Sequence, residues 1–269
     1  MRRVINLRPG RVAAFWLAVV PFLALVMVYA TTSQVRLAEN PNDKLLPSGE
    51  RLVESIERVA TVPDQRSGKI ILWSDTLASL QRLVLGVAIA ALIGLALGTV
   101  IGLLPYAGAT LSPLVGVISM VPPLAVLPIL FIVFGLGELA KVVLVVIGIT
   151  PFLVRDTALR VQELPEEQLI KAQTLGASSW QIMVRVVLPQ ILPRLLDAVR
   201  LSLGAAWLFL IAAEAIAATD GLGYRIFLLR RYLAMDVILP YVAWITLLAF
   251  LFDVGLRHLG RRLSTWAAA

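Results

Sequence analysis

The chain alternates long apolar runs with short polar breaks. Six runs are close to or longer than the roughly 20 residues that a helix needs to cross the hydrocarbon core of a bilayer. They cover residues 12–30, 77–104, 111–134, 139–159, 195–218 and 237–256. A helix bonds all of its backbone groups internally, so it is the expected spanning form. The pattern therefore predicts an all-α, polytopic membrane protein with six transmembrane helices.

Composition supports this class. The chain of 269 residues is 59% hydrophobic and only 15% charged, far less charged than a soluble domain of this length. We expect an N-terminal segment (1–11), a first transmembrane helix (12–30), a polar loop (31–75) and a core (76–266) that leaves no room for a separate soluble domain. The sequence has no cysteine, which excludes a disulfide framework and a thiolate metal site.

The basic residues give an orientation. The net charge is +7, but Lys and Arg are scattered over the loops instead of lining one face, so we expect anionic lipid and no nucleic acid as partner. Arginines gather before the first run and after the last one. By the positive-inside rule, these clusters place both termini in the cytoplasm. They are Arg2, Arg3, Arg8 and Arg11 at one end and Arg257, Arg261 and Arg262 at the other.

The first run has a second interpretation. Arg2 and Arg3 make a basic start and residues 28–30 resemble a signal cleavage site. The apolar run is long for a signal peptide, however, and its removal would leave five spans with the chain ends on opposite sides. We therefore expect a retained helix.

The longest polar interruption, 160–193, reads as two short helices joined at a glycine. Pro165 suits a first helical turn, and the glutamates after it suit the positive end of the helix dipole. Gly176 offers the left-handed residue that ends such a helix. Ser178 and Gln181 are spaced as a capping box for the second helix, which we expect Pro189 to end. The pattern is typical of a docking element at the water boundary, or of an amphipathic hairpin on the membrane surface.

This segment resembles the cytoplasmic coupling motif of binding-protein-dependent ABC importer permeases. The glycine, its spacing and the later Leu-Pro match, whereas Ile170 stands where the family has an acid. The resemblance implies a type I ABC importer permease-like fold and contact with an ATPase subunit. The residues it assigns to ATPase coupling are Leu169, Ala172, Leu175, Gly176, Ala177, Ser178, Trp180, Leu188 and Pro189.

The third run carries Pro122, Pro123 and Pro128, which free backbone carbonyls and bend a helix. The Pro-Pro-Leu-Ala pattern, followed by the stretch 134–138, resembles the nitrate/sulfonate/taurine branch of the family. It implies that this helix borders the translocation path at Met120, Pro122 and Pro123. A kink that serves packing alone is the alternative.

Glu214 lies inside the fifth run, where a carboxylate is costly. We expect it to face the translocation path or a partner, in a gating role. The alternative is a structural acid bonded to backbone N–H groups or to Arg225. Nearer the start of that run, Asp197 and Arg200 are spaced as a local ion pair.

The second run has a small residue at every fourth position, which places a smooth stripe on one helix face. Such a stripe lets another helix backbone approach closely, either within the chain or across a dimer. The stripe consists of Gly86, Ala90, Gly94, Gly98 and Gly102.

The polar loop contains one amphipathic stretch, with Leu52, Val53, Ile56, Val59 and Ala60 on one helical face. It resembles an external helix of nitrate, sulfonate and taurine permeases. Two roles fit equally: a surface helix on lipid headgroups, and part of the rim that receives a solute-binding protein.

No residue pattern indicates catalysis. His258 is the only histidine, and no phosphate-binding glycine loop ends in Lys-Ser or Lys-Thr. The chain is therefore expected to bind no cofactor and not to be an enzyme. The resemblance implies that ATP and Mg are bound by two separate ATPase subunits. It also implies a second permease copy in a homodimer and a periplasmic or lipid-anchored solute-binding protein at the inner membrane.

The expected solute is small and polar, of the nitrate, sulfonate or taurine type. The segment 230–236 resembles permeases associated with urea carboxylase and suggests a urea- or guanidine-like solute instead. Two other classes stay open. A membrane enzyme needs a cluster of His, Asp or Ser facing a cavity, and a channel or ATP-independent carrier needs no cytoplasmic docking element.

Overall fold

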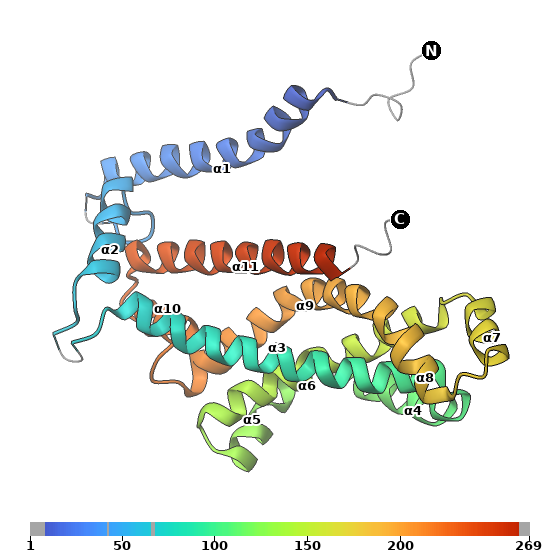
Figure 1. Ribbon diagram of the computed structural model, residues 1–269. Coiled ribbons are helices and arrows are strands. Elements are labelled where there is room, and N and C mark those ends of the chain that lie inside the picture. The colour runs from blue at the N-terminus through green and yellow to red at the C-terminus, as the bar shows by residue number, and fades with distance from the viewer. Residues whose placement is uncertain (1–8, 42, 66–67, 264–269) are drawn as a thin grey trace.

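The computed structural model describes residues 9–41, 43–65 and 68–263, and within these ranges the regular structure is helical. Figure 1 shows the helices lying along one another in an elongated bundle. In chain order they are α1 (Arg11–Glu39), α2 (Gly49–Thr61), α3 (Ile71–Leu103), α4 (Pro105–Ile118), α5 (Pro123–Phe134), α6 (Glu138–Gln162), α7 (Glu166–Thr174), α8 (Ser179–Ile182), the π-helical turn η2 (Met183–Val187), α9 (Leu188–Ala217), α10 (Leu222–Arg230) and α11 (Met235–Leu263).

The prediction of a polytopic helical membrane protein is confirmed. Among the described residues, five helical stretches are long and apolar enough to cross a membrane: α1, α3, α6, the continuous stretch Ser179–Ala217, and α11. A sixth span results if the pair α4 and α5, which is bent by 90°, counts as one. Most of the spans extend beyond the predicted runs, and α1 continues to Glu39.

The third run is not one kinked helix, as predicted, but two helices at a right angle. α4 ends at Ile118 and α5 starts at Pro123, with Pro122 extended at its N-cap (ψ 118°). Neither proline has a backbone N–H to continue the ladder of α4, and a proline disfavours helical geometry in the residue before it. The chain therefore turns here instead of bending.

The prediction that Pro189 ends the second short helix is wrong. The helix passes through the π-turn η2, where the Leu188 N–H bonds to the Met183 carbonyl oxygen, and continues as α9. The wider turn places Pro189 in the first turn of α9, where a missing N–H is tolerated. The side-chain amide of Gln190 donates to the Val186 carbonyl oxygen at 2.8 Å, which satisfies one group of this irregular turn.

The small-residue stripe of α3 packs against α6 of the same chain. A Cβ built on any glycine of the stripe would lie within 3 Å of an α6 side chain, so the two helices meet almost backbone to backbone. Gly86 faces Val145, Gly94 faces Leu153, Gly98 faces Thr157 and Gly102 faces Val161, while Ala90 is fully buried. We call this contact the α3–α6 seam.

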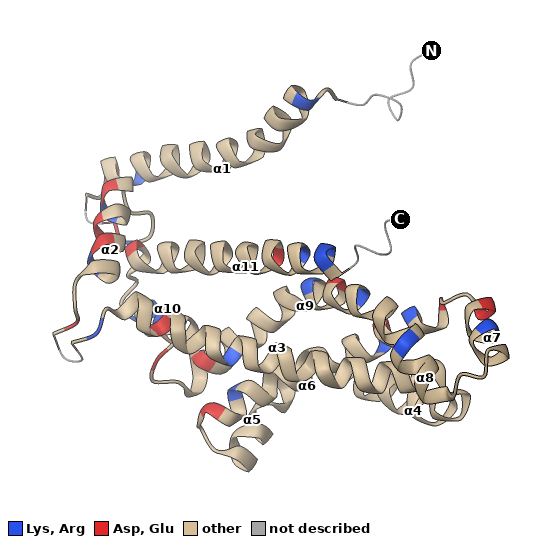
Figure 2. Ribbon diagram, viewed as in Figure 1, with Lys and Arg blue, Asp and Glu red and all other residues tan. Residues whose placement is uncertain are grey.

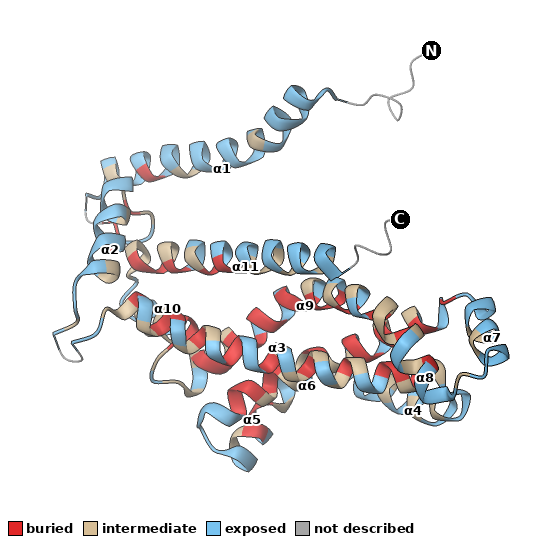
Figure 3. Cartoon of the chain, in the orientation of Figure 1, coloured by how far each residue is buried: buried red, intermediate tan, exposed pale blue. Residues whose placement is uncertain are grey.

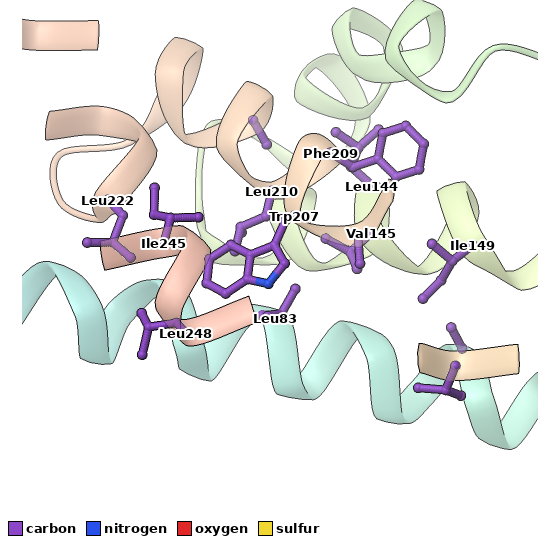
Figure 4. Close-up of a cluster of buried hydrophobic side chains, with 14 of the residues drawn as sticks. Leu83, Leu144, Val145, Ile149, Trp207, Phe209, Leu210, Leu222, Ile245 and Leu248 are labelled. Carbon is purple, nitrogen blue, oxygen red and sulfur yellow. The ribbon is translucent and has the colours of Figure 1, made fainter. Parts of the chain in front are cut away.

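α9 and α11 complete the core around the seam. Trp207 and Leu210 of α9 lie among Leu83 of α3, Val145 of α6 and Ile245 of α11 (Figure 4). These side chains are buried, as the red stretches on the facing sides of α3, α6 and α9 show in Figure 3. The core therefore lies where four spans meet.

α1 stands apart from this core. None of the residues in its most apolar stretch is buried, and Figures 1 and 3 show it as an exposed rod parallel to α11. It is fastened near its C-terminal end, where Tyr29 and Ser33 donate to the carbonyl oxygens of Pro47 and Leu46 at 2.8 and 2.9 Å. Arg36 also pairs with Asp43 and, together with the Leu45 N–H, holds the pKa of that carboxyl below its ordinary range.

The predicted amphipathic helix is present as α2. Ser48 caps it by accepting from the Arg51 N–H at 3.3 Å. Val59 and Ala60 pack against the core, and Ser55 donates to Asp236 at 2.9 Å, so α2 lies over the adjoining ends of α3 and α11. We call this the α2 end of the bundle. The start of α1 and the end of α11 both point toward the opposite, α7 end (Figure 1).

The seam gives a first prediction. A Cβ at Gly98 would lie 2.5 Å from the Thr157 Cβ and 2.8 Å from the Val154 carbonyl oxygen. We expect Gly98→Ala to destabilise the protein by about 1–3 kcal/mol through overpacking. Thermal unfolding in detergent, followed by circular dichroism, measures the change.

The matched control is Gly255→Ala in α11, where the added methyl meets nothing within 4 Å. Removing this helical glycine should leave the melting temperature unchanged or raise it. Equal melting temperatures for the two variants would show that α3 and α6 do not approach as closely as described.

Candidate functional site

Three features outside the hydrophobic core carry candidate chemistry: a surface segment at the α7 end, a pocket at the bend between α4 and α5, and a charge cluster near the α2 end. The first, which we call the coupling segment, comprises α7, α8 and the turn between them. Pro165 is at the N-cap of α7, one residue before the predicted place, and the first turn holds Glu166 and Glu167 at the positive end of the helix dipole.

The turn of the coupling segment has the predicted glycine geometry. Gly176 has φ +80°, a conformation that suits glycine. Its N–H bonds to the Gln173 carbonyl oxygen at 2.9 Å, and the Ala177 N–H bonds to that of Ala172 at 3.0 Å, which is a Schellman motif. The capping box is also confirmed, because Ser178 accepts from the Gln181 N–H while the Gln181 side chain accepts from the Ser178 N–H.

The residues assigned to ATPase coupling divide into two groups. Leu175 and Trp180 are 81% and 69% exposed. Leu169, Ala172 and Ala177 instead turn inward onto a small apolar cluster, and Leu188 and Pro189 are half-buried at the start of α9. That cluster consists of Val161, Leu164, Ile182, Val187 and Ile191. Ile170 is also 55% exposed, and the sequence did not single it out because it stands where the family has an acid.

The second feature, the break pocket, is a hollow of about 590 Å³ beside the 90° bend. Pro123 lines it, and Met120 and Pro122 lie in the turn at its edge. Of the four residues predicted for the path, only Pro123 is thus among the lining residues of this pocket, and Glu214 lies elsewhere. The lining residues are Ile118, Ser119, Val121, Pro123, Ile147, Gly148, Pro151, Phe152, Arg155, Asp156, Leu159 and Phe209.

The third feature is a buried charge cluster centred on Glu214, which has no exposed surface. Its carboxylate accepts from Ser79 Oγ at 2.8 Å, from the Arg82 guanidinium at 2.8 Å and from the Gly223 N–H at 2.9 Å. The alternative of a structural acid named backbone N–H groups or Arg225 as partners. The backbone donor is present, whereas Arg225 pairs with Asp75 at 2.8 Å.

Arg82 joins several elements through its remaining donors. It donates to Glu138 at the start of α6 and to Asp220 in the turn after α9, and Lys141 pairs with Glu138 at 2.7 Å. Figure 2 shows acidic and basic positions close together along α3 and near α5, in the half of the bundle that carries α2. Acid and base therefore neutralise each other inside a bundle in which an unpaired charge would be costly.

Backbone geometry around the cluster requires glycine. Gly221 has φ +110°, and a Cβ there would lie 2.6 Å from the Glu214 carboxyl carbon. Its N–H donates to Asp75 at 3.0 Å, so the turn supplies a main-chain donor where a side chain would not fit.

Burial lowers the pKa of Arg225, but hydrogen bonding and attraction to Asp75 outweigh the effect of burial, so the pKa of Arg225 is raised overall.

The sequence contained a signal for the cluster that was not recognised. Arg82 and Asp75 lie at the start of the second apolar run, and Glu214 lies near the end of the fifth. A basic and an acidic residue in two spans are most economically explained as partners. The local pair predicted between Asp197 and Arg200 is confirmed at 2.6 Å, and Arg200 also reaches Asp253 of α11 at 2.9 Å.

Residues 90–265 match the model of the family described as the binding-protein-dependent transport system inner membrane component. The chain belongs to this family. It is the permease subunit of an ABC transport system, a multi-pass protein of the inner membrane, as the resemblance of the coupling segment implied. The competing hypotheses of a membrane enzyme and of an ATP-independent carrier or channel are therefore set aside.

Curated relatives fall in the predicted branch. The permease is 36% identical over 242 residues to the taurine transport system permease protein TauC of Escherichia coli (strain K12). This match covers 90% of this chain and 86% of TauC. It is 33% identical over 177 residues to the bicarbonate transport system permease protein CmpB of Synechococcus elongatus, covering 65% of this chain and 63% of the relative. The nitrate import permease protein NrtB of the same organism is 32% identical over 151 residues, covering 56% of this chain and 54% of NrtB.

The fold also matches a solved transporter. An inward-facing structure of the MetNI methionine ABC transporter superposes with a TM-score of 0.64 at 22% sequence identity, covering 71% of this chain and 97% of the other. At this identity the match concerns the fold alone. It supports the predicted type I importer architecture.

The charge cluster gives the second prediction. Glu214→Gln keeps the shape and one acceptor oxygen but replaces the other with an NH2 group, which cannot accept. The variant therefore loses either the bond from Arg82 or the bond from the Gly223 N–H, together with the negative charge. We expect a loss of roughly 2–4 kcal/mol, because the buried guanidinium loses a charged partner. Thermal unfolding in detergent measures it.

The control is Asp220→Asn, which removes a partly exposed partner of the same guanidinium. Because exposed ion pairs contribute little, this variant should lose less than about 1 kcal/mol. Wild-type stability of Glu214→Gln would mean that the charge of Glu214 does not hold the bundle together.

Proposed function

We propose that two copies of this permease and two ATPase subunits form an importer that receives its solute from a solute-binding protein. ATP and Mg bind to the ATPase subunits, and the coupling segment of each permease seats on one of them. ATP binding closes the ATPase pair, the coupling segments move, and the spans switch the path from inward to outward access. ATP drives this change because the two conformations bind nucleotide differently.

The exposed apolar side chains of the coupling segment carry the proposal. Ile170 and Leu175 face outward on α7 and the turn after it, which lie outside the candidate spans, and Trp180 faces outward in the first turn of the stretch Ser179–Ala217. Outside the bilayer, exposed apolar side chains of this kind are buried when a partner protein binds over them. The inward-facing residues of the segment fix it to α6 and α9, so a force on it reaches both spans.

The arrangement of the chain ends supports a cytoplasmic α7 end. α1 begins and α11 ends on the side that carries the coupling segment (Figure 1). Arg11 lies at the start of α1, and Arg261 and Arg262 lie in the last turn of α11. Basic residues flanking spans are retained in the cytoplasm. The ATPase subunits would then meet the coupling segment in the compartment that holds ATP.

The α2 end then faces the binding protein. α2 carries charged residues on its outer side and packs on α3 and α11 with the other, which gives it a firm base. A firmly seated charged helix suits a docking rim better than a helix resting on lipid headgroups. The buried charge cluster lies just below this rim and would hold the outer ends of α3, α6 and α9 together, a structural role for Glu214.

The break pocket is the proposed section of the path within one permease copy. Pro123 lines this pocket and Met120 and Pro122 lie in the adjoining turn, which supports the proposal because interrupted helices are tolerated where they border a cavity. The relatives named for taurine, bicarbonate and nitrate transport support a small solute with an oxyanion group. Urea and guanidinium, suggested by the segment 230–236, serve as alternative solutes in the tests.

The coupling role is tested at Gly176. Its φ of +80° strains a β-branched residue, whereas asparagine tolerates this region, and a side chain there meets nothing within 4 Å. We expect Gly176→Val to abolish ATP-driven uptake and co-purification of the ATPase from the native host. Gly176→Asn should keep both.

Normal uptake and normal co-purification in Gly176→Val would remove the coupling role from this turn. Both variants should insert in the membrane and retain the wild-type helix content, because the change lies outside the bundle core. Loss of helix content in Gly176→Val but not in Gly176→Asn would instead assign the turn a folding role and contradict the proposal.

A further inference from the structure

The break pocket is mainly apolar, with charge at one place. Its walls come from the ends of α4 and α5, from α6 and from Phe209 of α9. Arg155 and Asp156 are its only charged lining residues, and both lie on α6. Ser119, in the turn between α4 and α5, supplies a hydroxyl opposite them. A hollow of this kind combines an apolar surface with a few polar groups, as small-molecule sites do.

Most N–H donors of the Arg155 guanidinium have no hydrogen-bond partner in the described part of the chain. In the described part of the chain it makes one hydrogen bond, to Ser119 Oγ at 3.1 Å, and no carboxylate pairs with it. A guanidinium offers five N–H donors. The neighbouring Asp156 is engaged elsewhere, since it faces Arg160 at 3.5 Å.

Three other arginines of the core spans have carboxylate partners. Arg82 pairs with Glu214, Arg160 with Glu163 and Arg200 with Asp253. Arg155 lies within the helix that forms the span α6, where an ionisable residue without a partner marks a functional site by default. Within the described residues, Arg155 is thus the arginine of α6 that has no carboxylate partner.

We propose that Arg155 and Ser119 form an oxyanion site in the break pocket, which holds the anionic group of the solute while the path faces inward. The inference rests on the proposed function and assigns it a specificity-determining residue. Arginine binds planar and tetrahedral oxyanions with two parallel hydrogen bonds. The Ser119 hydroxyl donates to the Gly116 carbonyl oxygen at 2.7 Å and accepts from Arg155 at 3.1 Å, so it holds the guanidinium at the pocket. Sulfonate, bicarbonate and nitrate groups all fit this donor set, as does a lipid phosphate.

The site is tested with a single cysteine, because the native chain has none. Ser119→Cys is introduced in the full-length permease, within its complex purified without nucleotide. The reaction rates with an anionic (sulfonatoethyl) and a cationic (trimethylammonioethyl) methanethiosulfonate are compared. We expect the anionic-to-cationic rate ratio to fall about fivefold when Arg155→Gln is added. Arg155→Lys should keep most of the ratio.

The control is Arg194→Gln, an exposed arginine of α9 that pairs with Glu163 and does not line the pocket. It should leave the rate ratio unchanged. An unchanged ratio in Arg155→Gln, or an equal fall in Arg194→Gln, would overturn the oxyanion site.

Protection experiments identify the occupant. Taurine, bicarbonate and nitrate should slow the labelling of the cysteine introduced by Ser119→Cys. Adding Arg155→Gln should raise the half-protecting concentration about tenfold or more, as expected for a lost charged hydrogen bond. The measurement is made in nanodiscs of phosphatidylcholine alone and with added phosphatidylglycerol. Protection by the anionic lipid but by none of the three solutes would assign the site to a headgroup and overturn the proposal. Protection by guanidinium or urea alone would also overturn it.

These readouts do not depend on ATP hydrolysis or on the binding protein. A failure of coupling in the Gly176 experiment therefore leaves the labelling result interpretable. Conversely, suppose that Arg155→Gln changes neither the rate ratio nor the protection while ATP-driven uptake is normal. This result would reject the oxyanion site but leave the proposed importer function intact.

Discussion

The bundle depends on one buried ion pair, between Arg82 of α3 and Glu214 of α9. Neither charge is tolerable alone between apolar spans, so each fixes the position of the other. The same guanidinium reaches Glu138 and Asp220, which adds the start of α6 and the turn after α9. The turn must then pass so close to the carboxylate that only glycine fits at 221. One pair thus sets the geometry of the α2 end.

Toward the other end, apolar packing joins the spans and the coupling segment, together with ion pairs of Glu163 with Arg160 and Arg194. The α3–α6 seam brings two spans together almost backbone to backbone, and a seam of this kind leaves little freedom for sliding. Beyond it, Val161 of α6, Ile182 of α8 and Ile191 of α9 form the cluster on which the coupling segment rests. A displacement of the coupling segment therefore moves α6 and α9 together. Since the ion pair holds α3 to α9 at the far end, the three spans form one body.

Features that depend on residues close together in the chain, such as helix caps and turns, could be predicted from the sequence. The positive φ of Gly176, the capping box of Ser178 and the amphipathic α2 each depend on a few adjacent positions, and all were found. The contacts that could not be predicted join segments that are far apart in the sequence. Arg82 and Glu214 are 132 residues apart, and no local pattern pairs them. The passage of a helix through Pro189 depends on the π-turn before it, and the prolines after Ile118 indicated an interruption of the helix but not its angle of 90°.

The most direct test of this single rigid body is a distance measurement between spin labels on α3 and α9. Leu92 and Leu201 are exposed, and because the chain has no cysteine, both can be replaced by Cys and labelled as a pair. The labelled permease is diluted with unlabelled permease, so that the distance within one chain is measured. We expect the distance within one chain to stay the same between the nucleotide-free and the ATP-bound complex. The distance between the Leu201 positions of the two copies should change. A change within the chain of more than about 2 Å, the scale of a helix shift, would contradict the rigid body.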